Sequence, residues 1–457
     1  MQLKCNEEST SVPRTEGAPV AFFRTASRSS QEGKPLARRA AGADAPPVRP
    51  PFRIVAFIVV GIFAGNAWAD DRVDSTVTWF QERRPEGKSL TVIHPQVDLG
   101  VDLGSVVSLG AGYEADIVSG ATPSIYAAPR PGDVDVVTSA SDFSDTRHSG
   151  HVNLTFTGSR SSLTVAYRYG TERDYRSNAI TVGGSVDLPG KNTTFGLSYT
   201  RNIDEVCDFN NGDAEPLERR PLTGQLACFS DDSKALTVSK PVRIDTLQAT
   251  VTQNVTPTLA LQLGLFGQIT QGLQSNPYRR VRVFQVDAQE SVPDIRDRGA
   301  VFLKMKLALP GIHATAALDL RGYSDTWGIN SGDVGVDWNQ YLGKHVLVRV
   351  RGRFYQQSSA SFFKTATDYE LTGPAGQYFT GDREHSAVRD LLAGGKLAYI
   401  VSADENGAVL GIFNDVDIHL NAEAIWYQEL VPGSPGAYAA GAFPDAIITE
   451  LGILLRY

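Results

Sequence analysis

Strict alternation of apolar and polar residues recurs along this chain, and it limits the possible folds more than any other feature. The clearest case is Thr258–Thr270, in which one face is apolar and the other carries small or polar residues. Ile312–Tyr323, Val346–Tyr355 and Val416–Trp426 repeat the pattern. A period of two residues is that of a β-strand, and apolar faces on many strands of about ten residues are typical of a transmembrane β-barrel. A soluble β-sandwich shows the same alternation but rarely sustains it through so many strands.

The links between the expected strands alternate between short and long. Short links are expected at Leu103–Ser105, Gly158–Ser161, Pro189–Asn192, Val255–Pro257, Leu309–Gly311 and Leu342–Lys344. Long links include Ser119–Asp145, Asp204–Lys240, Gly272–Asp297 and Ser358–His385. Outer-membrane barrels have short periplasmic turns and longer external loops. The sequence therefore predicts an all-β, antiparallel transmembrane barrel of about 16 strands, which begin near Val73, Leu90, Val106, Gly150, Leu163, Asn178, Thr193, Arg243, Thr258, Arg298, Ile312, Ser331, His345, Ala387, Val409 and Ala446.

The last strand, Thr449–Tyr457, ends the chain on an aromatic residue. Leu451, Ile453, Leu455 and Tyr457 share one face of this strand, and the opposite face is mostly polar or small. Such a terminal strand is typical of bacterial outer-membrane barrels, in which it closes the barrel and is recognised by the insertion machinery. We therefore expect these four residues to form the insertion signal.

The N-terminal region divides into two expected segments ahead of the barrel. Residues 1–53 are rich in Arg, Ser, Ala and Pro without periodicity, which predicts a disordered extension. Its length also fits a true start codon that lies further downstream. Residues 54–69 follow a basic flank at Arg53 and contain an apolar run and Ala67-Trp68-Ala69. Together these features predict a secretory signal peptide and its cleavage site. Residues 70–457 then form the barrel.

Charge and cysteine content exclude some classes of partner and cofactor. Removing residues 1–69 takes away nine of the 43 basic and five of the 51 acidic residues, which leaves a net charge of −12. No nucleic-acid partner is expected, because such a protein needs a basic stripe. Cys207 and Cys228 remain in one polar segment of an exported chain, so we expect a disulfide that clamps a surface loop. A zinc site is less favoured because the ligand set is incomplete, and no metal or other cofactor is expected.

Several stretches resemble an uncharacterised bacterial outer-membrane family known as domain of unknown function 3570. The similar stretches lie within most of residues 100–360 and are Tyr113-Glu-Ala-Asp-Ile-Val-Ser-Gly-Ala-Thr122, Glu172-Arg-Asp-Tyr175, Ser275-Asn-Pro-Tyr-Arg279, Val292-Pro-Asp-Ile-Arg-Asp-Arg298 and Tyr323-Ser-Asp-Thr-Trp-Gly-Ile329. The resemblance implies a barrel and no established activity. It therefore identifies no catalytic residue.

Charged residues on the polar faces of the strands are the candidate functional residues. Arg349, Arg351 and Arg353 form a basic ladder on one strand. The other candidates face the same interior and are Asp319, Arg321, Asp333, Asp337, Asp415, Asp417 and Glu423. Opposed basic and acidic ladders would set a transverse field that filters solutes by charge. Alternatively, the charges pair between neighbouring strands and brace the wall. The sequence leaves both hypotheses open.

External loops carry the other candidate groups. Asp174, Tyr175, Arg279, Arg280, Asp294, Arg296, Asp297 and Arg298 would either bind a ligand or join the loops by ion pairs. Asp208–Asp213 resembles a calcium loop only in part and is more typical of an Asx-rich turn. No common hydrolase or phosphate-binding motif occurs. His385 and His148 follow acidic residues near the outer rim, which leaves a barrel hydrolase as a remote alternative.

The sequence predicts a non-enzymatic channel or solute pore with a charged, polar lumen in the outer membrane of a Gram-negative bacterium. A barrel plugged by its loops, acting as a surface-binding or structural protein, needs the same features and remains the alternative. The expected partners are outer-membrane lipid, the insertion machinery and a small polar solute that the sequence does not identify. Nothing in the sequence sets the oligomeric state.

Overall fold

The computed structural model describes residues 71–82, 90–120, 143–210, 215–222, 228–229, 237–283, 286–363, 377–380, 382–403, 407–430 and 444–457. The predicted N-terminal extension, residues 1–53, and the predicted signal peptide, residues 54–69, lie outside the described residues. Among the described helices, none is long and apolar enough to cross a membrane.

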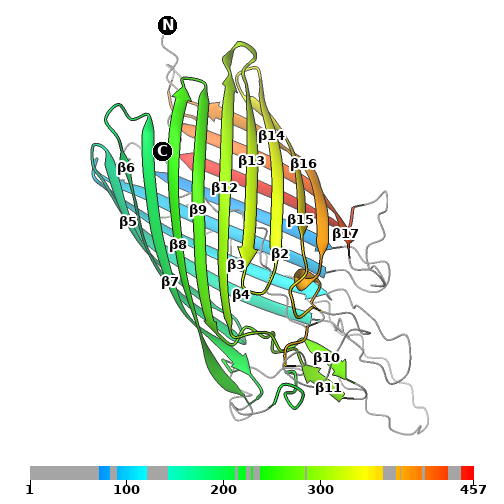
Figure 1. Ribbon diagram of the computed structural model, residues 1–457. Coiled ribbons are helices and arrows are strands. Elements are labelled where there is room, and N and C mark those ends of the chain that lie inside the picture. The colour runs from blue at the N-terminus through cyan, green and yellow to red at the C-terminus, as the bar shows by residue number, and fades with distance from the viewer. Residues whose placement is uncertain are drawn as a thin grey trace, which may run out of the picture.

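The chain forms a closed, antiparallel barrel of sixteen strands (Figure 1), which confirms the predicted fold class. Around the barrel each strand pairs with its neighbour in the chain, apart from one small hairpin between β9 and β12. The barrel strands are β1 (Arg72–Glu82), β2 (Leu90–Leu103), β3 (Val107–Gly120), β4 (Phe143–Thr157), β5 (Ser161–Thr171), β6 (Tyr175–Asp187), β7 (Thr193–Asp208), β8 (Val238–Thr256), β9 (Leu259–Gly272), β12 (Ile295–Leu309), β13 (Ala314–Asp325), β14 (Asn330–Leu342), β15 (Val346–Gln357), β16 (Val388–Ser402), β17 (Asp415–Glu429) and β18 (Ala446–Arg456).

The last strand closes the barrel by pairing with the first. The β1–β18 register runs without a break from Arg72 opposite Arg456 to Glu82 opposite Ala446. The backbone N–H of Tyr457 donates to the carbonyl of Asp71 at 2.9 Å, which extends this pairing to the end of the chain. Closure leaves no barrel edge unpaired, as a membrane-spanning sheet requires. The role of the last strand as an insertion signal stays a prediction.

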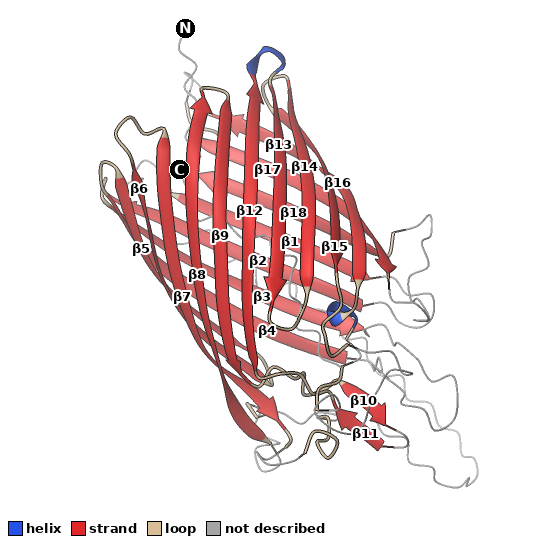
Figure 2. Ribbon diagram, viewed as in Figure 1, coloured by secondary structure: helices blue, strands red, loops and turns tan. Residues whose placement is uncertain are grey.

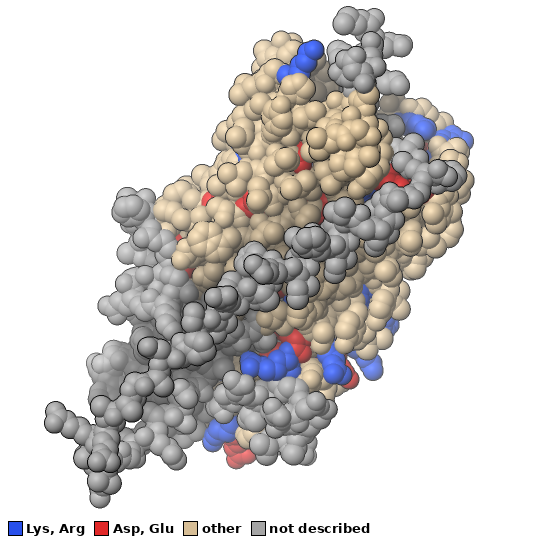
Figure 3. Space-filling model, turned by 180° about the vertical axis from the view of Figure 1, so that it is seen from behind, with Lys and Arg blue, Asp and Glu red and all other residues tan. Residues whose placement is uncertain are grey.

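The outward faces of the strands form an apolar belt. Leu265 is 54% exposed, Val350 59% and Leu397 55%, and their neighbours in sequence point to the other side of the sheet. On the face seen in Figure 3, the uncovered middle is mostly uncharged, and Lys and Arg side chains gather toward the two ends. Large apolar side chains left this exposed are costly in water, so hydrocarbon is the solvent that suits this surface.

Long links gather at the end of the barrel opposite the chain termini (the lower end in Figure 1). Residues 209–237, 273–294 and 358–387 connect strands at this end, which we call the outer end. The small hairpin of β10 (Arg280–Val283) and β11 (Val286–Gln289) belongs to one of these links and lies beyond the strand ends. Within the described parts of the chain, helical structure is confined to the short turns Pro310–Ile312 and Arg383–His385 (Figure 2).

Some predicted strand starts were wrong because the apolar pattern marks only the belt. β4 begins at Phe143 rather than near Gly150, and β8 at Val238 rather than near Arg243, because their polar outer segments continue the same ladders. The strand expected near Val409 begins at Asp415 instead. Leu410 and the next residue both have positive φ, which turns the chain where a strand would need an extended backbone.

Candidate functional site: the barrel lumen

The strand registers place all the predicted charged residues on the lumen side of the wall. In β15, Arg349, Arg351 and Arg353 alternate with Val350 and other apolar residues of the outward face. The same registers align Asp337 with Arg351, which shows that the polar faces of neighbouring strands coincide. The inner surface therefore carries the polar and charged side chains, with some apolar ones among them, and is enclosed by the apolar belt.

Each arginine of the β15 ladder forms an ion pair with an acidic residue of its own part of the wall. The pairs are Arg349 Nε to Asp337 Oδ1 at 2.6 Å, Arg351 Nη1 to Glu423 Oε1 at 3.4 Å and Arg353 Nη2 to Asp390 Oδ1 at 3.0 Å. Asp390 was missed by the sequence analysis, because β16 contains Leu391-Leu392 and so gives no clear alternation. Local pairing matches the wall-bracing hypothesis, and a charge-filter role stays a prediction.

The Arg351–Glu423 pair spans an intervening strand. Arg351 lies on β15 and Glu423 on β17, and Gly394 of β16 sits between them in register. A Cβ at position 394 would lie 2.6 Å from Glu423 Cγ and 2.6 Å from the carbonyl oxygen of Ala422. Glycine therefore leaves the space over which the glutamate side chain crosses β16 to reach the arginine.

Most of the remaining predicted charges also have neighbours of opposite sign. Asp319 Oδ1 lies 3.8 Å from Lys304 Nζ, and Asp415 Oδ2 lies 3.5 Å from Arg456 Nη1. Arg321 and Asp333 face each other in register between β13 and β14. Asp417 belongs to a second chain of groups, in which His419 Nδ1 lies 3.5 Å from Asp417 Oδ1 and His419 Nε2 lies 3.5 Å from Glu450 Oε1.

A further charged cluster on β2–β5 was not predicted. Arg168 Nη1 lies 2.6 Å from Glu114 Oε1, and Arg147 Nη2 lies 2.8 Å from Asp116 Oδ2. His94 Nδ1 is 2.6 Å from the other oxygen of Asp116. Polar residues alternate along β3 and β4, which indicated lumen-facing positions. Gly and Ala at neighbouring positions, however, made the apolar face difficult to recognise from the sequence.

Four consecutive strands, β6–β9, line the lumen with uncharged polar side chains. Among the described lumen-facing residues there, Asp187 near the inner end and Asp204 near the outer end enclose a stretch without charge. Hydroxyl and amide groups fill it. We call this stretch the neutral wall, and its polar members are Thr181, Ser185, Ser198, Thr200, Thr246, Gln248, Thr250, Thr252, Gln262 and Gln268.

The rest of the lumen, formed by β12–β18 and β1–β5, carries the charged groups and is here called the charged wall. Acidic and basic side chains are interleaved along it, as the β15 pairs show. The opposed basic and acidic ladders considered from the sequence are therefore not the arrangement of the described residues. Charges that pair within one wall cancel locally and leave a weaker field across the lumen.

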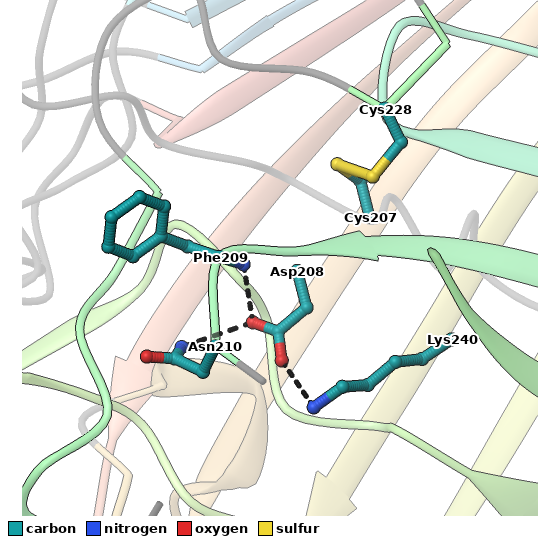
Figure 4. The surroundings of a disulfide bond; sticks show 6 residues. All are labelled: Cys207, Asp208, Phe209, Asn210, Cys228 and Lys240. Atoms are coloured by element: carbon teal, nitrogen blue, oxygen red, sulfur yellow. Dashed lines mark hydrogen bonds and ion pairs between the residues drawn. A yellow bond between two sulfur atoms is a disulfide. The ribbon is translucent and has the colours of Figure 1, made fainter. Parts of the chain in front are cut away.

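A disulfide holds the base of an outer loop at β7. Cys207 and Cys228 are bonded, with their Cα atoms 5.4 Å apart (Figure 4). Beside them, the Asp208 carboxylate lies 2.7 Å from Lys240 Nζ and 3.1 Å from Arg219 Nη2 and accepts from the N–H of Phe209. Lys240 and Arg219 therefore pair with the carboxylate that would bind the ion in a calcium loop. Among the described residues, no group of three or more His, Cys, Asp or Glu is placed to hold a metal.

Other outer loops pack into a small core of their own. Trp327, 3% exposed, contacts Phe362 and His385 edge-on, with ring centroids 5.2 Å apart in each case. Arg296 stacks on Trp327 at 4.1 Å and pairs with Asp325. These contacts favour the interpretation that the loop charges join loops to one another. Arg279, another predicted loop residue, pairs in the same way with Asp382.

The rim histidine His385 is placed for packing. Its Nδ1 lies 3.9 Å from Asp382 Oδ2, which is too long for a hydrogen bond. Burial, together with the nearby Arg296 and Arg279, holds the pKa of His385 well below its usual value, so the ring is neutral at pH 7. His148, the other candidate, lies 2.7 Å from the hydroxyl of Tyr113. Neither arrangement supplies a reason to assign catalysis.

The fold and its polar lumen define a porin-like β-barrel. Residues 61–404 match the family described as "Protein of unknown function (DUF3570)", and the chain belongs to that family. This confirms the family resemblance seen in the sequence motifs. No curated protein matches the chain in sequence.

Solved structures of bacterial barrels resemble the chain at low sequence identity. One is described as "Bacterial polysaccharide outer membrane secretin", with 10% identity, a TM-score of 0.42 and coverage of 86% of this chain and 99% of that one. Another is Pseudomonas aeruginosa OccK2 (OpdF) in complex with glucuronate, with 11% identity, a TM-score of 0.35 and coverage of 85% and 98%. The siderophore receptor PirA from Pseudomonas aeruginosa has 8% identity, a TM-score of 0.36 and coverage of 86% and 81%.

Proposed function

We propose that the protein is a channel for small polar solutes in the outer membrane of a Gram-negative bacterium. The barrel is closed, its outward face is an apolar belt and its inward face carries polar or charged side chains on every strand. In hydrocarbon, backbone polar groups must all be paired, and barrel closure satisfies this requirement. The inner surface then serves as the aqueous path.

The observation that carries the proposal is the exposure of lumen cations at the level of the apolar belt. The Lys304 side chain is 49% exposed, although its neighbour Leu303 belongs to the outward face. The Arg168 side chain is 46% exposed, beside the outward-facing Tyr167. Charges this accessible inside the belt are solvated from within, which fits a water-filled interior.

Ionic conductance tests the proposal. Purified protein refolded into a planar bilayer is expected to give stable unitary currents in potassium chloride. More carboxylates than cations line the charged wall near Glu450 and Asp417, so a modest cation preference is expected in a salt gradient. Barrels that insert and show heat-modifiable gel migration but carry no current would refute the channel.

A plugged barrel is the second candidate, and the core formed by the outer loops favours it. Trp327 and Phe362 are as buried as residues of a soluble domain, and the Cys207–Cys228 bond fixes another loop at the same end. If these loops close the outer mouth, reduction of the disulfide should raise conductance. Equal currents before and after reduction would leave the open channel as the better account.

The insertion machinery is the protein partner that we propose. The face of Leu451, Ile453, Leu455 and Tyr457 points outward from β18 and is open to such contact before the barrel closes. Deleting Tyr457 should therefore slow assembly in cells much more than refolding in detergent. A loss of equal size in both settings would indicate a purely structural role.

A further inference from the structure

The neutral wall extends across four strands as level rows of hydroxyl and amide groups. In one row, Thr181, Thr200, Thr246 and Gln268 are aligned in register from β6 to β9. The Thr181 and Thr200 hydroxyls are 2.8 Å apart, and Gln268 Nε2 donates to Thr246 Oγ1 at 2.9 Å. All four side chains face the lumen, and the threonines are only half-buried.

A second row nearer the inner end is also mostly hydroxyl and amide, but it begins at Asp187 of β6, whose carboxylate accepts from the Thr194 hydroxyl at 2.6 Å. There Thr194, Thr252 and Gln262 are aligned across β7, β8 and β9, and Gln262 Nε2 donates to Thr252 Oγ1 at 2.9 Å. A hydroxyl has one donor and two acceptor sites, and an amide has two donors. Each pair therefore leaves donors and acceptors free toward the lumen.

Aromatic rings flank these rows. Phe266 lies on the lumen side of β9. Phe302 of the neighbouring strand β12 places its ring over Gly264, which also belongs to β9. Both are partly exposed rather than buried. An aromatic face beside a dense set of hydroxyl and amide groups offers contact to the C–H face of a sugar ring and hydrogen bonds to its edge.

The opposite side of the lumen supplies acceptors of a different kind. In the circular strand order, β6–β9 lie across the barrel from β16–β18 and β1. That side carries Asp417, Glu423 and Glu450, which form parts of the ion pairs described above. A carboxylate accepts hydrogen bonds from solute hydroxyls, but it repels an anionic solute.

From this division we propose that the channel selects neutral polyhydroxylated solutes of the sugar class. The inference rests on the proposed channel function and adds its substrate class. The neutral wall exchanges hydrogen bonds with sugar hydroxyls at little desolvation cost, because both partners are neutral. The carboxylates across the lumen accept from the same solute and disfavour its acidic analogues.

The test measures salt current and sugar block in the same bilayer. We expect glucose to block the potassium chloride current. Glucuronate and a polyether of matched size should block it with an apparent affinity about fivefold lower, a ratio that corresponds to the free energy of about one hydrogen bond. Absence of salt current overturns both the channel and this inference. Salt current with equal block by all three solutes, or stronger block by glucuronate, overturns this inference alone.

Variants of the row that contains Thr181, Thr200 and Thr246 test whether glucose block depends on the neutral wall. The triple variant Thr181→Val, Thr200→Val and Thr246→Val keeps side-chain shape and strand propensity but removes three hydroxyls. Glucose block should weaken about fivefold or more, and the triple variant with Ser at the same positions should retain it. A measurable salt current shows that each variant barrel is folded and open. Unchanged glucose block in the Val variant overturns the assignment of this wall.

Discussion

The charged wall and the neutral wall are built on the same strand geometry but stabilise their polar groups differently. On the charged wall, side chains reach across one or even two strands to find a counter-charge, as Glu423 does in crossing Gly394. On the neutral wall, directly opposed hydroxyls such as Thr181 and Thr200 pair at short range. Space beside the side chains matters on both walls: Gly394 leaves room for Glu423, and a Cβ at Gly196 would lie 2.5 Å from the Thr250 hydroxyl.

The largest effect that separates the two walls is expected from Gly394→Ala. The added methyl meets the Glu423 side chain and the Ala422 carbonyl oxygen, each at 2.6 Å. We expect a loss of about 1–3 kcal/mol in the free energy of unfolding, the usual cost of overpacking. Urea unfolding of the barrel in detergent or lipid measures it.

Gly267→Ala is the matched control for that change. Nothing lies within 4 Å of a Cβ at position 267, which faces outward on β9. Its effect should stay within about 0.5 kcal/mol of zero, as for most uncrowded surface sites. Equal losses in the two variants would contradict the role assigned to the gap over β16.

The next effect concerns ion selectivity. Glu423→Gln removes one negative charge beside Arg351 in the lumen, so the permeability ratio should shift toward anions by about twofold. Reversal potentials in a salt gradient measure this ratio. The double variant with Arg351→Gln should return it toward the wild-type value. A ratio that is unmoved by Glu423→Gln would show that charges of this wall do not face the conducting path.

Thr200→Gln is expected to have a smaller effect on selectivity, because it changes neither charge nor polarity on the neutral wall. The longer amide narrows the lumen and should lower unitary conductance while leaving the reversal potential within error. Conductance and reversal potential come from the same recordings. A change in reversal potential as large as that of Glu423→Gln would break the distinction between the two walls.

The smallest expected effect is a pH response of the outer loops, outside both walls. The folded pKa of His385 lies well below its unfolded value of about 6.5, so the unfolded segment binds more protons below that pH. The stability of the loop core should therefore fall as pH decreases from 7.5 to 5.5. Arg279, Arg296 and Arg298 around the ring oppose its protonation.

Hydrogen-exchange protection factors of residues 358–363, 377–380 and 382–386 measure that response. Burial raises the pKa of Glu290 in the same loops, which works in the opposite direction because protonation then favours the folded state. His385→Phe isolates the histidine contribution and should flatten the response between pH 7.5 and 5.5. Protection factors that fall equally at low pH in both proteins would assign the effect to other groups.

Alternation of residue type and of link length together predicted the barrel, because an apolar outward face repeats with a period of two residues and the turns at the two ends differ in length. It placed the Arg349–Arg353 ladder on the lumen side but did not reveal Asp390 as a partner. Pairing depends on which residues the register sets opposite one another, and on gaps such as Gly394, and neither is visible along one strand. The neutral wall was missed for a related reason. Its threonines and serines are unremarkable singly and become a surface only when four strands are aligned.

Thiol labelling inside a conducting barrel tests the central claim most directly. Thr200→Cys places a thiol on the neutral wall, whereas Leu197→Cys places one on the outward face, where the native leucine is 58% exposed. The two native cysteines of the loop are already joined. A charged, water-soluble thiol reagent should reduce the current of Thr200→Cys in steps and leave Leu197→Cys unchanged. An unaffected Thr200→Cys current, or block through Leu197→Cys, would contradict a water-filled lumen lined by these strands.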